Sequence, residues 1–294
     1  MIGYKGILLA GGNGSRLYPL TSVTSKQLLP VYDKPMIYYP LSVLMLAGVR
    51  DILVITRPED QTAFNNLLGD GSQWGLRIEY KVQSKPEGIA QGLLLGEEFL
   101  SGAGCVFILG DNIFYGAGLS GFLQSAIKKN SGATIFSYAV SDPERYGVVE
   151  FDDKKRISRL VEKPSKPPSN QAVTGLYIMD GTASIKTKSI KKSARGELEI
   201  VDLLNMYLAN QQLEYAKFQR GVAWLDTGTP ESLLEASLFV ETVEKRQGYK
   251  IACLEEIAFF NNWISEKKVK KFVAENPSSS IADYLKGLIR NDIH

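Results

Sequence analysis

A short, continuous apolar run near the start of the chain ends directly in a group of glycines. Residues 6–10 read GILLA and residues 11–17 read GGNGSRL. An apolar run without alternation is typical of a strand that is buried on both faces, as in parallel sheets covered by helices on both sides. These residues therefore predict a buried parallel strand that leads into a loop, and not an edge strand.

The same pattern returns along the first half of the chain. Further strand-like runs occupy residues 51–56, 77–82, 105–109 and 133–138. Segments with helical character lie among them, at residues 37–47, 61–68 and 119–129. Strands that alternate with helices indicate a central, mostly parallel sheet with helices on both faces. We therefore expect an α/β fold, a Rossmann-like three-layer sandwich.

The pattern changes after about residue 141. Residues 146–151 and 157–162 alternate around a turn and predict a β-hairpin, and residues 172–179 predict a further strand. Helices are expected at 200–210 and at 230–244, the second with Thr229 as its cap and Pro230 in its first turn. The mixed sheet would then have two halves, about 1–140 and 141–240, followed by a C-terminal helical extension at 241–294.

Composition argues against several classes of protein. Lys and Arg number 34 and Asp and Glu 32, so the net charge of +2 does not favour a nucleic-acid-binding surface. Cys105 and Cys253 are too few for a disulfide framework or a Cys-rich zinc site. The single histidine is His294, which argues against a His-dependent triad, metal site or general base.

No apolar run reaches the ~20 residues of a membrane span and no signal-peptide layout is seen, so we expect a cytoplasmic protein.

The glycine-rich loop at residues 11–17 is suited to binding phosphate. Its glycines let the backbone turn sharply and present N–H groups to a ligand, and Arg16 can bond phosphate oxygens bidentately. The spacing excludes the dinucleotide fingerprint, which needs glycine where Leu17 stands, and the Walker pattern. A plain strand–helix turn is the alternative. Lys26 follows soon after, and is either a solvated charge or a second cation folded over the same ligand.

Two aspartates are candidates for a metal site. Asp111 follows the apolar run 106–109, and a carboxylate at the carboxyl end of a central strand lies where open α/β sheets bind ligands. Asp226 precedes the expected helix at 230–244. Each could instead serve as a turn or cap residue. Two carboxylates and phosphate oxygens form a hard oxygen environment, which suits magnesium and not zinc or copper.

The segment 83–92 is a candidate for binding a nucleobase. A Gln83 side-chain amide can pair with the imide edge of a pyrimidine, and Gly88 would leave room for a flat ring. A common polar loop is the alternative. Arg195 belongs to a cationic run, 186–195, that we interpret as a solvated face.

Taken together, the loop 11–17 and the segments KQLLPV (26–31) and KPMI (34–37) resemble the sugar-phosphate nucleotidylyltransferases. Within them the sequence is most similar to the glucose-1-phosphate thymidylyltransferases. The resemblance extends from residue 5 to about 238 and continues more loosely through 251–258. Ser84 departs from the family's pattern in the base-binding segment and leaves the fine shape of the base pocket open. Residues 259–264 depart from it as well, which leaves a regulatory site in the C-terminal helices undefined.

The resemblance implies a catalytic domain at 1–240, divided into a nucleotide-binding half and a sugar-binding half. It implies transfer of a deoxythymidylyl group from dTTP to glucose 1-phosphate, giving dTDP-glucose and pyrophosphate, in a homotetramer at the first step of dTDP-sugar biosynthesis (such as dTDP-L-rhamnose). The catalytic residues it implies are Arg16, Lys26, Asp111, Lys163 and Asp226, with Mg²⁺ held by Asp111 and Asp226. The nucleotide-binding residues are Leu9, Gly11, Gly12, Asn13, Gly14, Ser15, Arg16, Gln27, Gln83, Pro86, Gly88 and Asp111. The sugar-phosphate-binding residues are Asn112, Tyr146, Gly147, Glu162, Lys163, Val173, Tyr177 and Trp224.

Three alternatives stay open at this point. The enzyme could use UTP and another sugar 1-phosphate. It could be a catalytically silent nucleotide-sugar sensor, against which the presence of all five catalytic candidates argues. An NAD-dependent dehydrogenase is disfavoured by Leu17 at the position where its fingerprint needs glycine.

Overall fold

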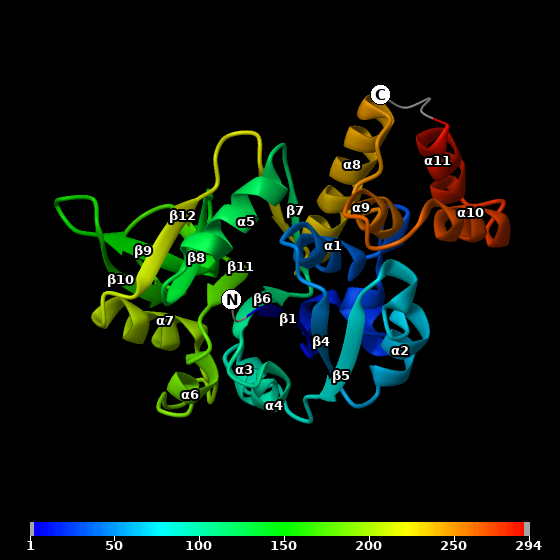
Figure 1. Cartoon of the computed structure of the whole chain (residues 1–294). Helices are drawn as coiled ribbons and strands as arrows, with labels where there is room; N and C mark the ends of the chain where they lie inside the picture. Colours follow the sequence, from blue (N-terminus) through cyan, green and yellow to red (C-terminus); the bar gives the residue numbers. More distant parts are fainter. Residues whose placement is uncertain (1–2, 291–294) are drawn as a thin grey trace.

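The computed structural model describes residues 3–290, and a nine-stranded mixed sheet forms its centre (Figure 1). The strands are β1 (Tyr4–Ala10), β4 (Asp51–Thr56), β5 (Arg77–Val82), β6 (Gly104–Leu109), β8 (Ala133–Ala139), β9 (Gly147–Phe151), β10 (Ile157–Glu162), β11 (Gln171–Met179) and β12 (Leu213–Lys217). Their order is β10-β9-β11-β6-β1-β4-β5, with β8 paired to both β11 and β12. The expected Rossmann-like α/β fold is confirmed.

The N-terminal part of the sheet is parallel. Neighbouring strands β6, β1, β4 and β5 all run in the same direction, and Leu8 of β1 pairs with Val54 of β4 and with Ile108 of β6. Strand β11 reverses direction against β6, β8 and β9, whereas β12 runs parallel to β8. The loops that follow β1 and β6 therefore leave the sheet at the same edge, where open α/β sheets bind ligands.

Helices cover both faces of the sheet, as the alternation predicts. They are α1 (Tyr38–Leu46), α2 (Gln61–Leu68), α3 (Gln91–Leu95), α4 (Glu97–Leu100), α5 (Leu119–Lys129), α6 (Ala183–Thr187) and α7 (Ile200–Ala209). Leu8 and Val54 are buried in the core cluster that also holds residues of α1, α2 and α5, and Ile7 and Leu53 in the cluster shared with α3, α4, α6 and α7. Alternate residues of each strand thus contribute to opposite cores.

The C-terminal part is helical, as predicted for the described residues. It comprises α8 (Pro230–Gln247), α9 (Leu254–Phe260), α10 (Glu266–Glu275) and α11 (Ser280–Ile289). Helix α8 begins with a capping box, in which the Thr229 hydroxyl accepts from the Ser232 N–H at 3.2 Å and the Ser232 hydroxyl accepts from the Thr229 N–H at 3.0 Å. Helix α8 continues across residue 240, where the catalytic domain was expected to end. The expectations for 291–294, including His294, lie outside the described residues, and no helix within 3–290 has the length and apolar composition of a membrane span.

Three short strand pairings were not predicted from the sequence. Strand β12 was not expected, β2 (Pro30–Val31) pairs with β3 (Lys34–Pro35), and β7 (Asn112–Tyr115) pairs antiparallel with β13 (Ala223–Asp226). The β7–β13 ribbon matters most for function, because it joins the segment after β6 to the segment before α8. It therefore brings the segment before α8 beside the end of β6.

Candidate active site

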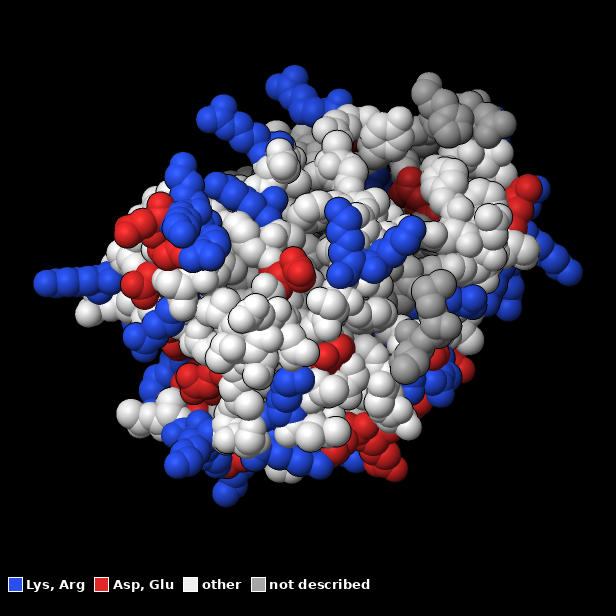
Figure 2. All heavy atoms as spheres, turned by 60° about the vertical axis from the view of Figure 1, so that its left-hand side comes forward, with Lys and Arg blue, Asp and Glu red and all other residues white. Residues whose placement is uncertain are grey.

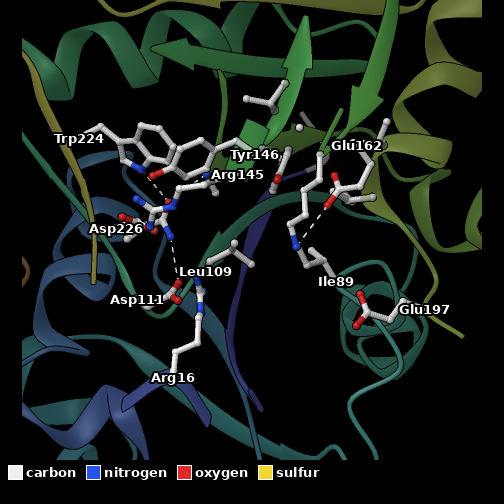
Figure 3. A pocket seen from close by; sticks show the side chains of 18 of the residues that line it. Arg16, Ile89, Leu109, Asp111, Arg145, Tyr146, Glu162, Glu197, Trp224 and Asp226 are labelled. Carbon is white, nitrogen blue, oxygen red and sulfur yellow. Dashed lines mark hydrogen bonds and ion pairs between the residues drawn. The ribbon is translucent and has the colours of Figure 1, made fainter. Parts of the chain in front are cut away.

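A cavity of about 700 Å³ opens where the two halves of the sheet meet, beyond the carboxyl ends of β1 and β6 (Figure 3). Many predicted site residues line it: Ser15, Arg16, Asp111, Asn112, Tyr146, Gly147, Glu162, Lys163, Val173, Tyr177, Trp224 and Asp226. They come from segments throughout residues 15–226. The fold thus places residues that are far apart in the sequence in the lining of one cavity.

Asp111 and Asp226 are brought together by the β7–β13 ribbon. Asp226, the last residue of β13, is in register with Asn112, the first residue of β7, and Asp111 directly precedes Asn112. Thr227 reinforces the junction, because its backbone N–H and its hydroxyl donate to the Asp111 carbonyl at 3.2 and 2.9 Å. In Figure 3 the two carboxylates lie on the same side of the cavity. Two acidic side chains from distant segments therefore share one site.

The Asp111 carboxylate is paired with a cation. The Lys26 ammonium forms an ion pair with Oδ2, and the Asn112 amide donates to Oδ1 at 2.9 Å. Burial by itself raises the pKa of Asp111, but the Lys26 charge and these two hydrogen bonds outweigh it, so the net pKa is lowered. Asp111 is consequently held in its anionic form, the form in which a carboxylate binds a metal ion.

Asp226 experiences a different balance. Burial raises its pKa and the nearby Asp111 charge raises it further, while Arg145 and Arg16 act in the opposite direction without reversing the shift. Arg145 donates from Nη2 to Asp226 Oδ2 at 3.2 Å. Because two carboxylates repel each other in a partly buried cavity, an additional positive charge between them is favoured.

Asn112 is a structural junction as well as a cavity residue. Its side-chain oxygen accepts from the Trp224 indole N–H at 2.7 Å and from the Gly175 N–H at 3.0 Å. A Cβ on Gly175 would lie only 2.5 Å from that oxygen, so this position requires glycine. The amide thereby ties β11 and β13 to Asp111. It was predicted as a sugar ligand, and the structure shows that much of its hydrogen-bonding capacity serves the protein itself.

The glycine loop lies against the segment that was predicted to bind the base. A Cβ on Gly11 would clash with the Gln83 side-chain oxygen, so glycine allows Gln83 to lie beside the loop. Gln83 is buried and donates to the Gln91 side chain at 2.6 Å. Gln27 is also buried, and accepts from the Ser25 hydroxyl at 2.6 Å. Both glutamines are thus held in place by neighbouring side chains.

The remaining predicted nucleotide residues lie outside the lining of the described cavity, as do Gln27 and Gln83. They are Leu9, Gly11, Gly12, Asn13, Gly14, Pro86 and Gly88, together with the catalytic candidate Lys26. The structure explains why position 88 is a glycine, which the sequence alone did not suggest. Its φ is +105°, and a Cβ there would clash with the Leu198 backbone, whose N–H donates to the Glu87 carbonyl at 2.7 Å. Glycine is needed here for backbone packing.

The far end of the cavity carries Glu162 and Lys163. Burial raises the pKa of Glu162, and Glu199 raises it further, although Lys163 and Arg195 counteract the shift. The Lys163 ammonium lies 3.7 Å from Glu162 Oε1, and Arg195 donates to the same oxygen at 3.1 Å. A Cβ on Gly147 would lie 3.3 Å from Glu162 Oε2. A partly buried carboxylate between two cations suits recognition of a polar, anionic ligand.

Sequence reasoning missed several cavity residues. Arg145 directly precedes the predicted Tyr146–Gly147 pair, and its position there was the available signal. Arg195, interpreted as part of a solvated face, is exposed and lies outside the cavity lining, and it bonds Glu199 at 2.8 Å besides Glu162. Glu197 and the apolar lining residues had no distinguishing pattern; the latter are Ile89, Leu109, Ile200 and Val201.

The local charges come from the cavity wall and not from a broad basic surface. On the face shown in Figure 2, Lys and Arg side chains are interspersed with Asp and Glu. Arg16 is exposed, and its guanidinium lies beside Gly228, where an added Cβ would be 2.8 Å away. Anionic ligands would thus be attracted by individually placed cations.

The donor set can be tested against a metal ion. Within residues 3–290 no group of three or more His, Cys, Asp or Glu side chains is arranged to hold one. Asp111 and Asp226 provide two carboxylates, paired here with Lys26 and Arg145, and oxygen atoms of phosphate and water would complete the coordination. Such an all-oxygen set, shared between protein and substrate, fits Mg²⁺-like ions and not zinc or copper.

Comparison with known proteins agrees with this geometry. The nucleotidyl transferase family model matches residues 5–243. A glucose-1-phosphate thymidylyltransferase of Neisseria gonorrhoeae is 56% identical over 285 residues, which cover 97% of this chain and 99% of that protein. One from Xanthomonas campestris pv. campestris is 54% identical (97% of both chains), and one from Mycobacterium tuberculosis 46% (98% of this chain and 100% of that one).

Solved structures show the same fold. A Bacillus anthracis protein described as a glucose-1-phosphate thymidylyltransferase, in complex with sucrose, has a TM-score of 0.75 and 42% identity, covering 81% of this chain and 95% of that one. A UDP-glucose pyrophosphorylase with UDP-glucose has a TM-score of 0.72 at 24% identity, covering 82% and 99%, a likeness of fold alone. The family implies a divalent metal ion as cofactor. The chain belongs to the nucleotidyl transferase family, and within it to the glucose-1-phosphate thymidylyltransferases.

Proposed function

We propose that this chain transfers a deoxythymidylyl group from dTTP to α-D-glucose 1-phosphate, forming dTDP-glucose and pyrophosphate. The observation that carries the proposal is the joining of Asp111 and Asp226 in one cavity, with Arg16 on its wall and Lys163 in its lining as well. This arrangement provides charge neutralisation for two polyanions that must approach each other. The relatives' activity supports the choice of dTTP and glucose 1-phosphate.

The chemistry requires little proton transfer. An oxygen of the sugar phosphate attacks the α-phosphorus of dTTP in line, a new P–O bond forms, and the bond to the departing pyrophosphate breaks. The attacking oxygen belongs to a phosphate that is already anionic at neutral pH, so no general base is needed. Residues 3–290 contain no histidine, which agrees with this mechanism. Catalysis then depends on positioning and on electrostatic stabilisation.

Asp111 and Asp226 are the residues we propose to hold the metal ion, and we propose that the ion is Mg²⁺. When bound, it would supply a positive charge that neutralises phosphate oxygens and polarises the phosphorus centre. Lys26 already neutralises Asp111 in this structure. We assign Lys26, together with Arg16, to interaction with the α-phosphate and the pyrophosphate.

The two substrates would occupy opposite parts of the site. We assign the glycine loop 11–16 and Gln83 to the nucleotide, and Lys163 to the phosphate of the sugar. Glu162 and Tyr177, both in the cavity lining, are suited to the sugar hydroxyls, since a carboxylate and a phenol can each accept hydrogen bonds from them. The apolar side chains of Leu109 and Val201 lie in the same lining.

The test is pyrophosphate release by the purified full chain with a panel of nucleotides and sugar 1-phosphates, with and without Mg²⁺. We expect dTTP and glucose 1-phosphate to be the preferred pair, no turnover without the divalent ion, and a large loss in Arg16→Ala. Arg156→Gln, in an exposed ion pair with Asp152 on the hairpin, is the matched control. Turnover only with UTP, or undiminished activity of Arg16→Ala, would contradict the assignment.

Assembly and pathway are proposed from the family alone. We propose a homotetramer that supplies dTDP-glucose to the biosynthesis of dTDP-sugars such as dTDP-L-rhamnose. Light scattering coupled to size-exclusion chromatography measures the subunit number. A monomer at assay concentration would contradict the tetramer without affecting the proposed reaction.

A further inference from the structure

We propose that Arg145 is a positioning residue that holds the Asp226 carboxylate in place for the divalent ion. The inference rests on the proposed function and deepens it. It concerns a residue that the sequence patterns did not reveal. Arg145 belongs to the cavity lining, but its hydrogen bonds are directed to acidic side chains of the protein.

The guanidinium of Arg145 bridges two carboxylates. Nη1 donates to Asp142 Oδ2 at 2.6 Å, and Nη2 donates to Asp226 Oδ2 at 3.2 Å. The planar group has several donors in a fixed geometry, so fixing one nitrogen on Asp142 also fixes the direction of the other. Asp142 directly precedes a single 3₁₀ turn, Pro143–Arg145, and Arg145 is its last residue, which keeps the first of these contacts local.

Aromatic rings support Arg145 from the side. Its guanidinium carbon lies 5.4 Å from the centre of the Tyr146 ring, and that ring packs against Trp224 at 5.1 Å between centroids. The Trp224 indole N–H donates to Asn112, whose amide donates to Asp111. Figure 3 shows Arg145, Tyr146 and Trp224 grouped beside Asp226. A continuous set of contacts thus runs from Arg145 to both predicted metal-binding carboxylates.

The orientation of Asp226 matters because the protein supplies so few ligands. The described residues offer two carboxylates and no larger acidic cluster for the metal ion. An incorrectly oriented Asp226 would therefore leave the protein with one metal ligand instead of two. Residues that orient metal-binding side chains contribute about 10–100-fold to metal affinity or activity. Arg145 engages Asp226 through Oδ2. We therefore assign its main effect to metal binding and not to sugar-phosphate binding.

The direct test is the affinity for Mn²⁺, measured by electron paramagnetic resonance on the full chain with dTTP and without acceptor. We expect Arg145→Gln to weaken Mn²⁺ binding by about 10–100-fold, and Arg145→Lys to recover only part of it, because an ammonium lacks the planar fork. Arg156→Gln should leave the affinity unchanged. In steady-state assays the KM for glucose 1-phosphate of Arg145→Gln should change less than about twofold.

A second variant separates positioning from a general structural effect. If Asp142 acts through Arg145, Asp142→Asn weakens Mn²⁺ binding less than Arg145→Gln does, and adds nothing in the Arg145→Gln background. Unchanged Mn²⁺ affinity in Arg145→Gln, or a raised KM for glucose 1-phosphate with normal Mn²⁺ affinity, would overturn the inference. Wild-type protein that neither binds Mn²⁺ with dTTP nor releases pyrophosphate would instead refute the proposed function itself.

Discussion

Asp226 is in register with Asn112 across the β7–β13 ribbon, and Asn112 directly follows Asp111. The two carboxylates are therefore placed by main-chain pairing and not by flexible loops. Trp224, two residues before Asp226, bonds the Asn112 side chain as well. A site built on paired strands keeps its geometry more accurately than one on loops, which suits a reaction that depends on positioning.

Replacing either carboxylate should abolish most of the activity. Asp111→Asn and Asp226→Asn keep the shape of the side chain but remove one of the two negative charges available for the metal ion. We expect kcat/KM to fall by more than about 100-fold, a larger effect than that of a residue that only orients a ligand. Steady-state kinetics at several Mg²⁺ concentrations measures it.

The control for this experiment is Asp152→Asn, because Asp152 lies in the turn of the β9–β10 hairpin and pairs with the exposed Arg156. It should retain wild-type kinetics. An Asp226→Asn enzyme with normal turnover and normal Mg²⁺ dependence would show that Asp226 does not bind the metal.

Lys163→Ala should mainly impair the use of glucose 1-phosphate. Its ammonium is exposed and lies 3.7 Å from Glu162, so it remains accessible to a phosphate group in the cavity. Loss of one charged hydrogen bond costs about 1.5–3 kcal/mol, or roughly 10–150-fold in kcat/KM for the sugar phosphate. The KM for dTTP should change little. Lys166→Ala, three residues further along the loop, is the control, and an equal loss in both variants would contradict a specific role.

The sequence was informative where the signal was local. Runs such as 51–56 and 77–82 match strands β4 and β5 residue for residue. Strand β4 is buried on both faces and reads as a continuous apolar run, whereas β5 lies at the edge of the sheet and alternates between exposed and more buried residues. The β7–β13 ribbon was not predictable, since its strands are four residues long and their pairing joins distant segments. Asp111 and Asp226 were therefore identifiable as candidates by residue type and resemblance, whereas their proximity depends on a register that only the fold reveals.

The reason for Gly88 was equally hidden, and it leads to a prediction. Gly88→Ala combines a positive φ of +105° with a clash against the Leu198 backbone. We expect the free energy of unfolding to fall by about 1–3 kcal/mol. Urea denaturation measures this change.

Gly118→Ala is the matched control for Gly88→Ala. Gly118 also has a positive φ, +74°, but a Cβ there meets nothing within 4 Å, so this variant pays only the backbone cost. The difference between the two variants reports the contact with Leu198 together with the larger departure of Gly88 from the left-handed region. Equal losses of stability in the two variants would contradict the packing explanation.

The C-terminal helices contain a carboxyl group that should make stability depend on pH. Glu256 on α9 accepts a hydrogen bond from the Tyr284 hydroxyl of α11 at 2.8 Å. Burial raises the pKa of Glu256 from 4.5 to about 7, although the Tyr284 hydrogen bond opposes the shift. The folded state therefore holds this proton more tightly than the unfolded state. The contribution of protonated Glu256 to the free energy of unfolding is fully present below the unfolded pKa of 4.5, and it is lost as the pH rises through about 7.

Between pH 4.5 and 7 the free energy of unfolding should accordingly fall with rising pH, by at most about 3 kcal/mol for this group. Glu256→Gln keeps an acceptor for Tyr284 but cannot ionise, so this part of the slope should disappear and the variant should gain stability over the wild type at pH 8. Urea denaturation at pH 5 to 8 measures it. Glu266→Gln is the control, because Glu266 is exposed and pairs with Lys270 at 2.6 Å. A Glu256→Gln variant with the wild-type slope would mean that Glu256 titrates normally in the folded state.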